Sequence, residues 1–95
     1  MKREGDTWVV FFYAPWCGHC TAAAPSFQQA ALQAPVHFAR LDAAAYSDVA
    51  QAEGVTGYPT IRLYDKGEVV ANFGGERTVV DFLDFARQAV KKLRG

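Results

Sequence analysis

Cysteine and histidine are scarce in this sequence of 95 residues, which contains two of each. A structural zinc site normally takes four protein ligands, and a catalytic zinc site takes three. His19 lies between the two cysteines, Cys17 and Cys20, and His37 falls in a segment with the pattern of a strand, so a second pair of metal ligands is lacking. This shortage argues against a zinc site, and we expect neither a metal nor another bound cofactor.

The sequence also lacks an excess charge of one sign and a long hydrophobic run. Ten basic residues balance ten acidic ones, so there is no basic stripe of the kind that binds nucleic acid. The longest apolar run, from Trp8 to Ala14, is far shorter than the roughly 20 residues of a membrane-spanning helix. The polar stretch from Met1 to Asp6 does not have the pattern of a secretory signal. We therefore expect no nucleic-acid partner and no insertion into a membrane.

Hydrophobic residues make up 51% of the chain, which is enough for one core and predicts a single domain over residues 1–95. The stretch 7–13 is apolar at nearly every position, which is typical of a strand buried on both faces. The order of predicted elements indicates an α/β fold with a central mixed sheet flanked by helices. These elements are strands at 7–13, 36–41, 60–64 and 68–73, and helices at 18–33, 45–53 and 79–93.

The two cysteines form a C-x-x-C motif that follows the first strand and opens the first helix. Such a position supports thiol–disulfide chemistry, because a helix N-terminus stabilises the thiolate of Cys17. Cys20, one turn further on, can close a disulfide with Cys17. A disulfide that spans four residues restrains the unfolded chain very little. The spacing therefore favours a redox-active Cys17–Cys20 disulfide over a structural one.

Three segments resemble the catalytic domain of the protein disulfide isomerase family, which has the thioredoxin fold. The segment from Phe12 to Cys20 is similar to the active-site segment of that family. The segment from Gly54 to Ile61 resembles its second signature, a loop that carries a cis-proline, and Gly75 to Thr78 resembles a weaker third one. The resemblance begins at about Thr7 and implies a thioredoxin-like fold that lacks the first strand and helix.

The resemblance assigns roles to the C-G-H-C segment. It implies that Cys17 is the nucleophile and Cys20 the resolving cysteine. His19 is expected to favour the Cys17 thiolate and so to make the disulfide form a better oxidant. Gly18 is expected to form part of the surface that meets the substrate.

The resemblance assigns further roles outside this segment. The peptide bond before Pro59 is expected to be cis, and the backbone of Tyr58 to pair with an extended substrate. Trp16 and Tyr58 would form an apolar rim for unfolded chains. Arg77 is expected to approach the buried Cys20 and to lower its pKa.

Two positions depart from the pattern of the family. Phe11 stands where the family usually has a buried acid that moves protons to and from the resolving cysteine. Thr21 stands where a lysine commonly follows the second cysteine. The attack by Cys17 should survive these changes, whereas release of the substrate by Cys20 is expected to be slow.

The resemblance implies a thiol–disulfide oxidoreductase and isomerase that acts on unfolded or disulfide-containing proteins. It further implies a monomeric domain in the lumen of the endoplasmic reticulum, with glutathione or an upstream oxidase as redox partner. Two alternatives stay open. The chain is also compatible with an electron-relay module of a larger oxidase, or with a weakly active module that binds unfolded chains.

Overall fold

The computed structural model describes residues 4–94, which fold into one four-stranded sheet and three helices. The strand order is β2-β1-β3-β4. β1 pairs in parallel with β2 and antiparallel with β3, and β4 pairs antiparallel with β3. This mixed sheet confirms the predicted thioredoxin-like α/β architecture. In chain order the elements are β1 (Glu4–Tyr13), α1 (Gly18–Ala31), β2 (Val36–Asp42), α2 (Ser47–Ala52), β3 (Thr60–Asp65), β4 (Glu68–Asn72) and α3 (Val79–Arg94).

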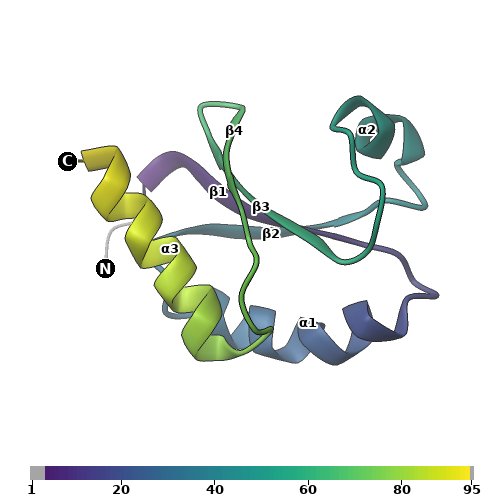
Figure 1. Ribbon diagram of the computed structural model, residues 1–95, viewed down its shortest axis with the longest axis horizontal. Helices are drawn as coiled ribbons and strands as arrows, with labels where there is room; N and C mark the ends of the chain where they lie inside the picture. Colours follow the sequence, from purple (N-terminus) through teal and green to yellow (C-terminus); the bar gives the residue numbers. More distant parts are fainter. Residues whose placement is uncertain (1–3, 95) are drawn as a thin grey trace.

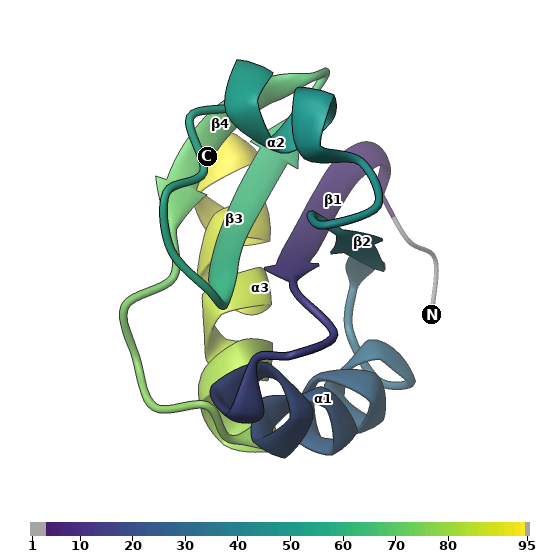
Figure 2. The same cartoon turned by 90° about the vertical axis from the view of Figure 1, so that its right-hand side faces the viewer.

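Helices cover both faces of the sheet, but they do so unequally (Figures 1 and 2). The long helices α1 and α3 lie together on one face, and the six-residue helix α2 lies over the other. Helices on both faces were expected from the element order. Nowhere in residues 4–94 does a helix combine the length and the apolar character needed to cross a membrane.

The main core lies between the sheet and the two long helices and is rich in phenylalanine. Phe27 of α1 stacks against Phe38, and its ring centroid lies 4.9 Å from that of Phe11. Phe82 of α3 meets Phe27 edge to face at 5.4 Å. Phe11 and Phe82 are fully buried as expected, whereas Phe38 and Phe85 pack at the margin of the core and are only partly buried.

A smaller core lies under α2, where Phe12 packs with Ala43, Ala50 and Val55. This cluster covers only one end of that face of the sheet. Trp8, also on β1, remains 39% exposed. The prediction that β1 is buried on both faces is therefore wrong at Trp8, because α2 is too short to reach it.

Local hydrogen bonds explain why two helices are shorter than the sequence pattern indicates. The side chain of Asp42 accepts hydrogen bonds from the backbone N–H groups of Ala44 and Ala45, which holds these residues in a turn and delays the start of α2 to Ser47. The N–H of Gln33 donates to the carbonyl of Ala30, three residues back. The tightened turn ends α1 at Ala31 instead of at Gln33.

The predicted turn and capping residues adopt the expected conformations. Lys66 and Gly67 have φ angles of 53° and 83° and form the tight turn between β3 and β4. Gly54, at φ 71°, follows the end of α2. Thr78 caps α3, because its hydroxyl accepts a hydrogen bond from the N–H of Asp81 at 3.2 Å. Leu93, expected on the apolar stripe of α3, is exposed at the end of that helix.

Candidate functional site

Cys17 occupies the N-cap position of α1, directly after the turn that follows β1. Its sulfur accepts a hydrogen bond from the N–H of Cys20 at 3.2 Å, so the thiol takes the place of the usual Ser, Thr or Asp oxygen. Its own N–H donates to the carbonyl of Ala14 at 3.0 Å, and its carbonyl accepts from the hydroxyl of Thr21 at 3.2 Å. Three contacts therefore fix the reactive sulfur at the positive end of the helix dipole.

The pKa of Cys17 is lowered below the ordinary value of a thiol. A side-chain hydrogen bond from Cys20 is the largest cause, and burial opposes it. Backbone hydrogen bonds from Cys20 and His19, and the positive charge of Arg77, lower the pKa further. Since the thiolate is the nucleophile, these groups prepare Cys17 for attack on a disulfide.

The pKa of Cys20 moves in the opposite direction, to about 11. Burial is the largest cause, because the side chain is only 2% exposed and its thiolate would be poorly solvated. The hydrogen bond with Cys17 raises the pKa as well, whereas a backbone hydrogen bond from Ala14 and the charge of Arg77 lower it. Both cysteines are free thiols in the structure, so the pair consists of one activated and one suppressed sulfur.

Alkylation of the reduced protein should therefore distinguish the two thiols by pH. The rate at Cys17 should rise and level off at a lower pH than that of an ordinary thiol, because the pKa of Cys17 is lowered. The rate at Cys20 should still be rising at pH 10. Iodoacetamide labelling followed by peptide mass spectrometry measures both rates in one sample. Equal pH profiles at the two residues would contradict this assignment of the pair.

An aromatic surface lies beside the cysteines. Trp16 is 74% exposed and meets the ring of Tyr58 edge to face, with centroids 5.6 Å apart. The Tyr58–Pro59 peptide bond is cis, as predicted, and the hydroxyl of Thr60 holds the preceding turn by donating to the carbonyl of Gly57 at 2.6 Å. The structure thus brings together two segments that are about 40 residues apart in the sequence. The use of this surface by a substrate stays a prediction.

The remaining predicted residues, Gly18, His19 and Arg77, are all exposed. A Cβ added at Gly18 would meet nothing within 4 Å, so the surface at this position is open. A backbone hydrogen bond from His19 lowers the pKa of Cys17, and the positive charge of Arg77 lowers the pKa of both thiols. Within residues 4–94, no three His, Cys, Asp or Glu side chains form a group that could hold a metal ion.

A cavity of about 340 Å³ lies beside Cys20, on the face of the sheet that carries α1. Phe11 and Arg40 line it, and these two residues are paired across β1 and β2. None of the described residues that line the cavity is acidic, so Phe11 leaves Cys20 without a neighbouring carboxylate there. Sequence reasoning did not single out Arg40, because its position depends on the pairing register of two distant strands.

Comparison with known proteins places these features in a family. The family model for Thioredoxin matches residues 1–88 of the chain. Protein disulfide-isomerase TMX3 from Mus musculus is 43% identical over 92 residues, which cover 92% of this chain and 20% of that protein. Protein disulfide-isomerase A4 from Homo sapiens is 37% identical over 90 residues, which cover 90% of this chain and 14% of that protein. The chain thus spans about a fifth or less of the length of these relatives.

Solved structures show the same architecture. The first thioredoxin domain of mouse protein disulfide-isomerase A4 superposes with a TM-score of 0.78 and 36% identity, covering 90% of this chain and 64% of that one. Human ERp44 superposes with a TM-score of 0.81 and 34% identity, covering 87% of this chain and 27% of that one.

Proposed function

This chain belongs to the thioredoxin family, and from that premise we propose that Cys17 and Cys20 exchange disulfides with protein substrates, as a thiol–disulfide oxidoreductase of the protein disulfide isomerase type. The opposite pKa shifts of the two thiols carry this proposal. A sulfur that ionises more readily than an ordinary thiol can attack a disulfide, and a neighbour one turn away that stays protonated can complete the exchange. A disulfide with a purely structural role does not require that its two thiols differ in pKa.

The exchange begins when the Cys17 thiolate attacks one sulfur of a substrate disulfide. A mixed disulfide forms, and the other substrate sulfur leaves as a thiolate that takes up a proton. Cys20 then gives up its proton and attacks the sulfur of Cys17. The second substrate thiol is released, the Cys17–Cys20 disulfide forms, and the substrate is reduced by two electrons. The reverse sequence oxidises a substrate dithiol, and attack followed by exchange within the substrate isomerises it.

The aromatic surface supports protein chains as the substrates. Trp16 offers a large exposed ring, and its contact with Tyr58 sets the two rings at right angles beside the nucleophile. We expect the backbone of Tyr58 and Pro59 to pair with an extended segment of the substrate. Gly18 leaves room for that segment to approach Cys17.

The refolding of a protein with scrambled disulfides tests this function. The reduced and oxidised chain together should catalyse recovery of the native pairing, and Cys17→Ala should abolish the catalysis because no other residue supplies the attacking thiolate. A Leu32→Ala chain serves as a matched control, since Leu32 is exposed at the far end of α1. Equal refolding rates with the wild type and with Cys17→Ala would contradict the enzyme function. The alternative of a module that binds unfolded chains would then remain.

His19 should tune the direction of the reaction. A cationic imidazole beside Cys17 stabilises the dithiol form and so makes the disulfide form a stronger oxidant. We expect His19→Ala to lower the reduction potential, by about 30 mV for each tenfold loss in the equilibrium constant. Equilibration with glutathione redox buffers measures the change. An unchanged potential would restrict the role of His19 to its backbone hydrogen bond with Cys17.

The cellular setting is part of the same proposal. We place the domain in the lumen of the endoplasmic reticulum, as a monomer, with glutathione or an upstream oxidase restoring its disulfide. The alternative of an electron-relay module in a larger oxidase has the same chemistry but a different partner. A potential near that of thioredoxin, about −270 mV, would favour a reductant over an isomerase.

A further inference from the structure

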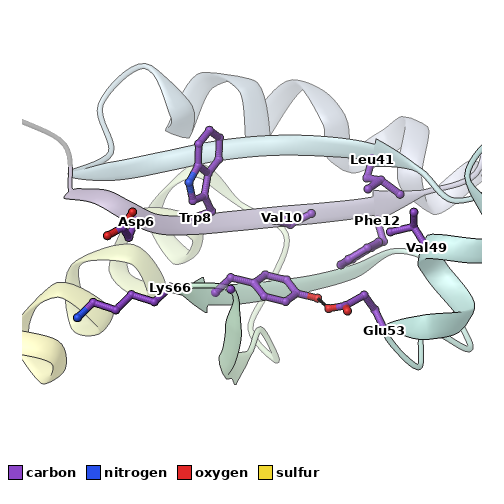
Figure 3. A pocket seen from close by; sticks show the side chains of 10 residues that line it. Asp6, Trp8, Val10, Phe12, Leu41, Val49, Glu53 and Lys66 are labelled. Carbon is purple, nitrogen blue, oxygen red and sulfur yellow. Dashed lines mark hydrogen bonds between the residues drawn. The ribbon is translucent and has the colours of Figure 1, made fainter.

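The two faces of the sheet differ in the charged side chains that line their hollows. A groove of about 450 Å³ lies on the face that carries α2, and Asp6 and Glu53 are among the residues that line it (Figure 3). The hydroxyl of Tyr64 donates a hydrogen bond to the carboxylate of Glu53 at 2.6 Å. The cavity beside Cys20 is lined by α1 and lies on the opposite face, so the sheet separates this thiol from both carboxylates.

The resolving step nevertheless needs a base at Cys20. This side chain is 2% exposed and its pKa is about 11, so the thiol is protonated near neutral pH. It has to lose its proton when it attacks the sulfur of Cys17 in the mixed disulfide. The described residues that line the cavity beside Cys20 include no carboxylate and no imidazole. The proton must therefore pass to a group that enters the cavity from outside.

Arg40 carries the sole charge among the described residues that line this cavity. It is paired with Phe11 across β1 and β2, so both side chains lie on the face that carries α1. Arg40 is exposed, and its guanidinium forms no hydrogen bond or ion pair with residues 6–93. A guanidinium binds a carboxylate through two parallel hydrogen bonds. The cavity thus contains a cation that is accessible from solvent and suited to hold an anion.

The size and the walls of the cavity suit a small organic acid. Its volume of about 340 Å³ equals that of roughly ten water molecules in the liquid, so an anion such as acetate fits together with water. Phe11, Ala24 and Pro25 provide apolar wall. Apolar surroundings raise the pKa of a bound carboxylic acid, which makes the carboxylate a stronger base, whereas the charge of Arg40 lowers that pKa.

We propose that this cavity binds a small carboxylate anion at Arg40, and that the bound carboxylate accepts the proton of Cys20 in the resolving step. The proposal rests on the thiol–disulfide exchange proposed above. One carboxylate oxygen faces the guanidinium, and the other reaches the thiol directly or through one water molecule. Arg40 is then a positioning residue, because it acts on the thiol only through the anion.

The proposed step conserves both protons and electrons. The carboxylate takes the proton of Cys20, and the resulting thiolate attacks the sulfur of Cys17. The Cys17–Cys20 disulfide forms, and the substrate sulfur leaves as a thiolate with the electron pair of the broken bond. This thiolate takes up the proton from the carboxylic acid, directly or through solvent. The carboxylate is thereby regenerated and is not consumed.

The reaction of the complete reduced chain with equimolar 4,4′-dithiodipyridine tests this step, because that disulfide contains no carboxylate. Attack by Cys17 releases a first equivalent of thiopyridone, and attack by Cys20 releases a second. Stopped-flow absorbance separates the two phases. At constant pH and ionic strength, replacing chloride by acetate should accelerate the second phase by at least about tenfold and with saturation. The first phase should not depend on acetate.

Nitrate is the matched control for acetate. It has the same charge and a similar planar group of oxygens, but it is a far weaker base. Nitrate alone should therefore leave the second phase unchanged. In a mixture it should reduce the effect of acetate, because both anions compete for Arg40.

Substitutions at Arg40 locate the bound anion. Arg40→Gln should abolish the saturable response to acetate, because the neutral amide does not attract the anion. Arg40→Lys should retain part of the response, since an ammonium group also binds a carboxylate. Arg87→Gln is the matched control, because Arg87 is an exposed arginine of α3 that does not line the cavity, and it should respond as the wild type does. Circular dichroism establishes that each variant is folded.

A second arm distinguishes a free acid from an acidic side chain of the substrate as the source of the carboxylate. Two disulfide-bonded peptides are compared without acetate, one with glutamate beside its cysteine and one with glutamine. Acid quenching and mass spectrometry follow the decay of the mixed disulfide. Faster decay with the glutamate peptide, lost in Arg40→Gln, would assign the carboxylate to the substrate. A response to acetate alone would assign it to a free acid.

Two results would overturn the proposal while leaving the proposed function intact. The first is the release of both equivalents with a second phase that responds to neither source of carboxylate. The second is a response to acetate that persists in Arg40→Gln or that nitrate reproduces, because it would then be an effect of the buffer or of the salt. The absence of any second phase in the wild type would contradict the resolving role of Cys20 and this proposal with it.

Discussion

Replacing Cys20 by serine is expected to trap the protein on its substrate. The serine hydroxyl can still donate a hydrogen bond to the sulfur of Cys17, so the attack that forms the mixed disulfide should continue. Serine cannot act as the resolving thiol, and release should slow by at least about 100-fold. Non-reducing gel electrophoresis with a disulfide-bonded substrate should show a covalent adduct that dithiothreitol removes.

The wild type provides a second measure of the same step. The pKa of Cys20 is about 11, and among the described residues that line the cavity beside it, Phe11 included, none is a carboxylate that could accept the proton. Release should therefore accelerate as the pH rises from 7 to 10, and it should do so more steeply than the initial attack. No adduct with Cys20→Ser, or a release rate that is independent of pH, would contradict the assignment of Cys20 as the resolving cysteine.

Phe27→Ala should lower the free energy of unfolding by about 3–5 kcal/mol. Phe27 is fully buried, and its ring contacts those of Phe11, Phe38 and Phe82. Its removal takes away the side chain that joins α1 and α3 to the sheet and leaves a cavity. A small domain has a free energy of unfolding of about 5–15 kcal/mol in total, so this one substitution should remove a large part of it.

Urea unfolding followed by circular dichroism measures the loss at Phe27. Leu32→Ala is the matched control on the same element, because Leu32 is 72% exposed at the C-cap of α1. That substitution should change the free energy of unfolding by less than about 0.5 kcal/mol. Similar losses in the two variants would show that the phenylalanine cluster does not hold the layers together.

The chemistry of the site was predictable because its parts are local. The C-x-x-C spacing, the preceding strand and the start of a helix all lie within residues 7–20. The loop at Tyr58 and Pro59 is also a contiguous signature, and its cis bond was expected from the resemblance. The order of helices and strands along the chain was predictable for the same reason, since turns and helix caps such as Lys66 and Thr78 are encoded by neighbouring residues.

The features that were missed depend on contacts between distant residues. The exposure of Trp8 follows from the place of α2, which packs over Phe12 at the other end of β1. The position of Arg40 beside Phe11 and Cys20 follows from the register of β1 and β2. Periodicity in one segment cannot report which element packs against it, so neither the cavity nor the groove was visible in the sequence.

The reduction potential of the Cys17–Cys20 pair tests the central proposal most directly. The measurement equilibrates the chain with glutathione buffers and determines the fraction of the dithiol form. A pair of the isomerase type, in which the lowered pKa of Cys17 and the imidazole of His19 favour the dithiol form, should have a potential of about −180 mV. A reduction potential of about −270 mV, or failure of Cys17 and Cys20 to form a disulfide, would contradict the proposal that this is an isomerase-type site.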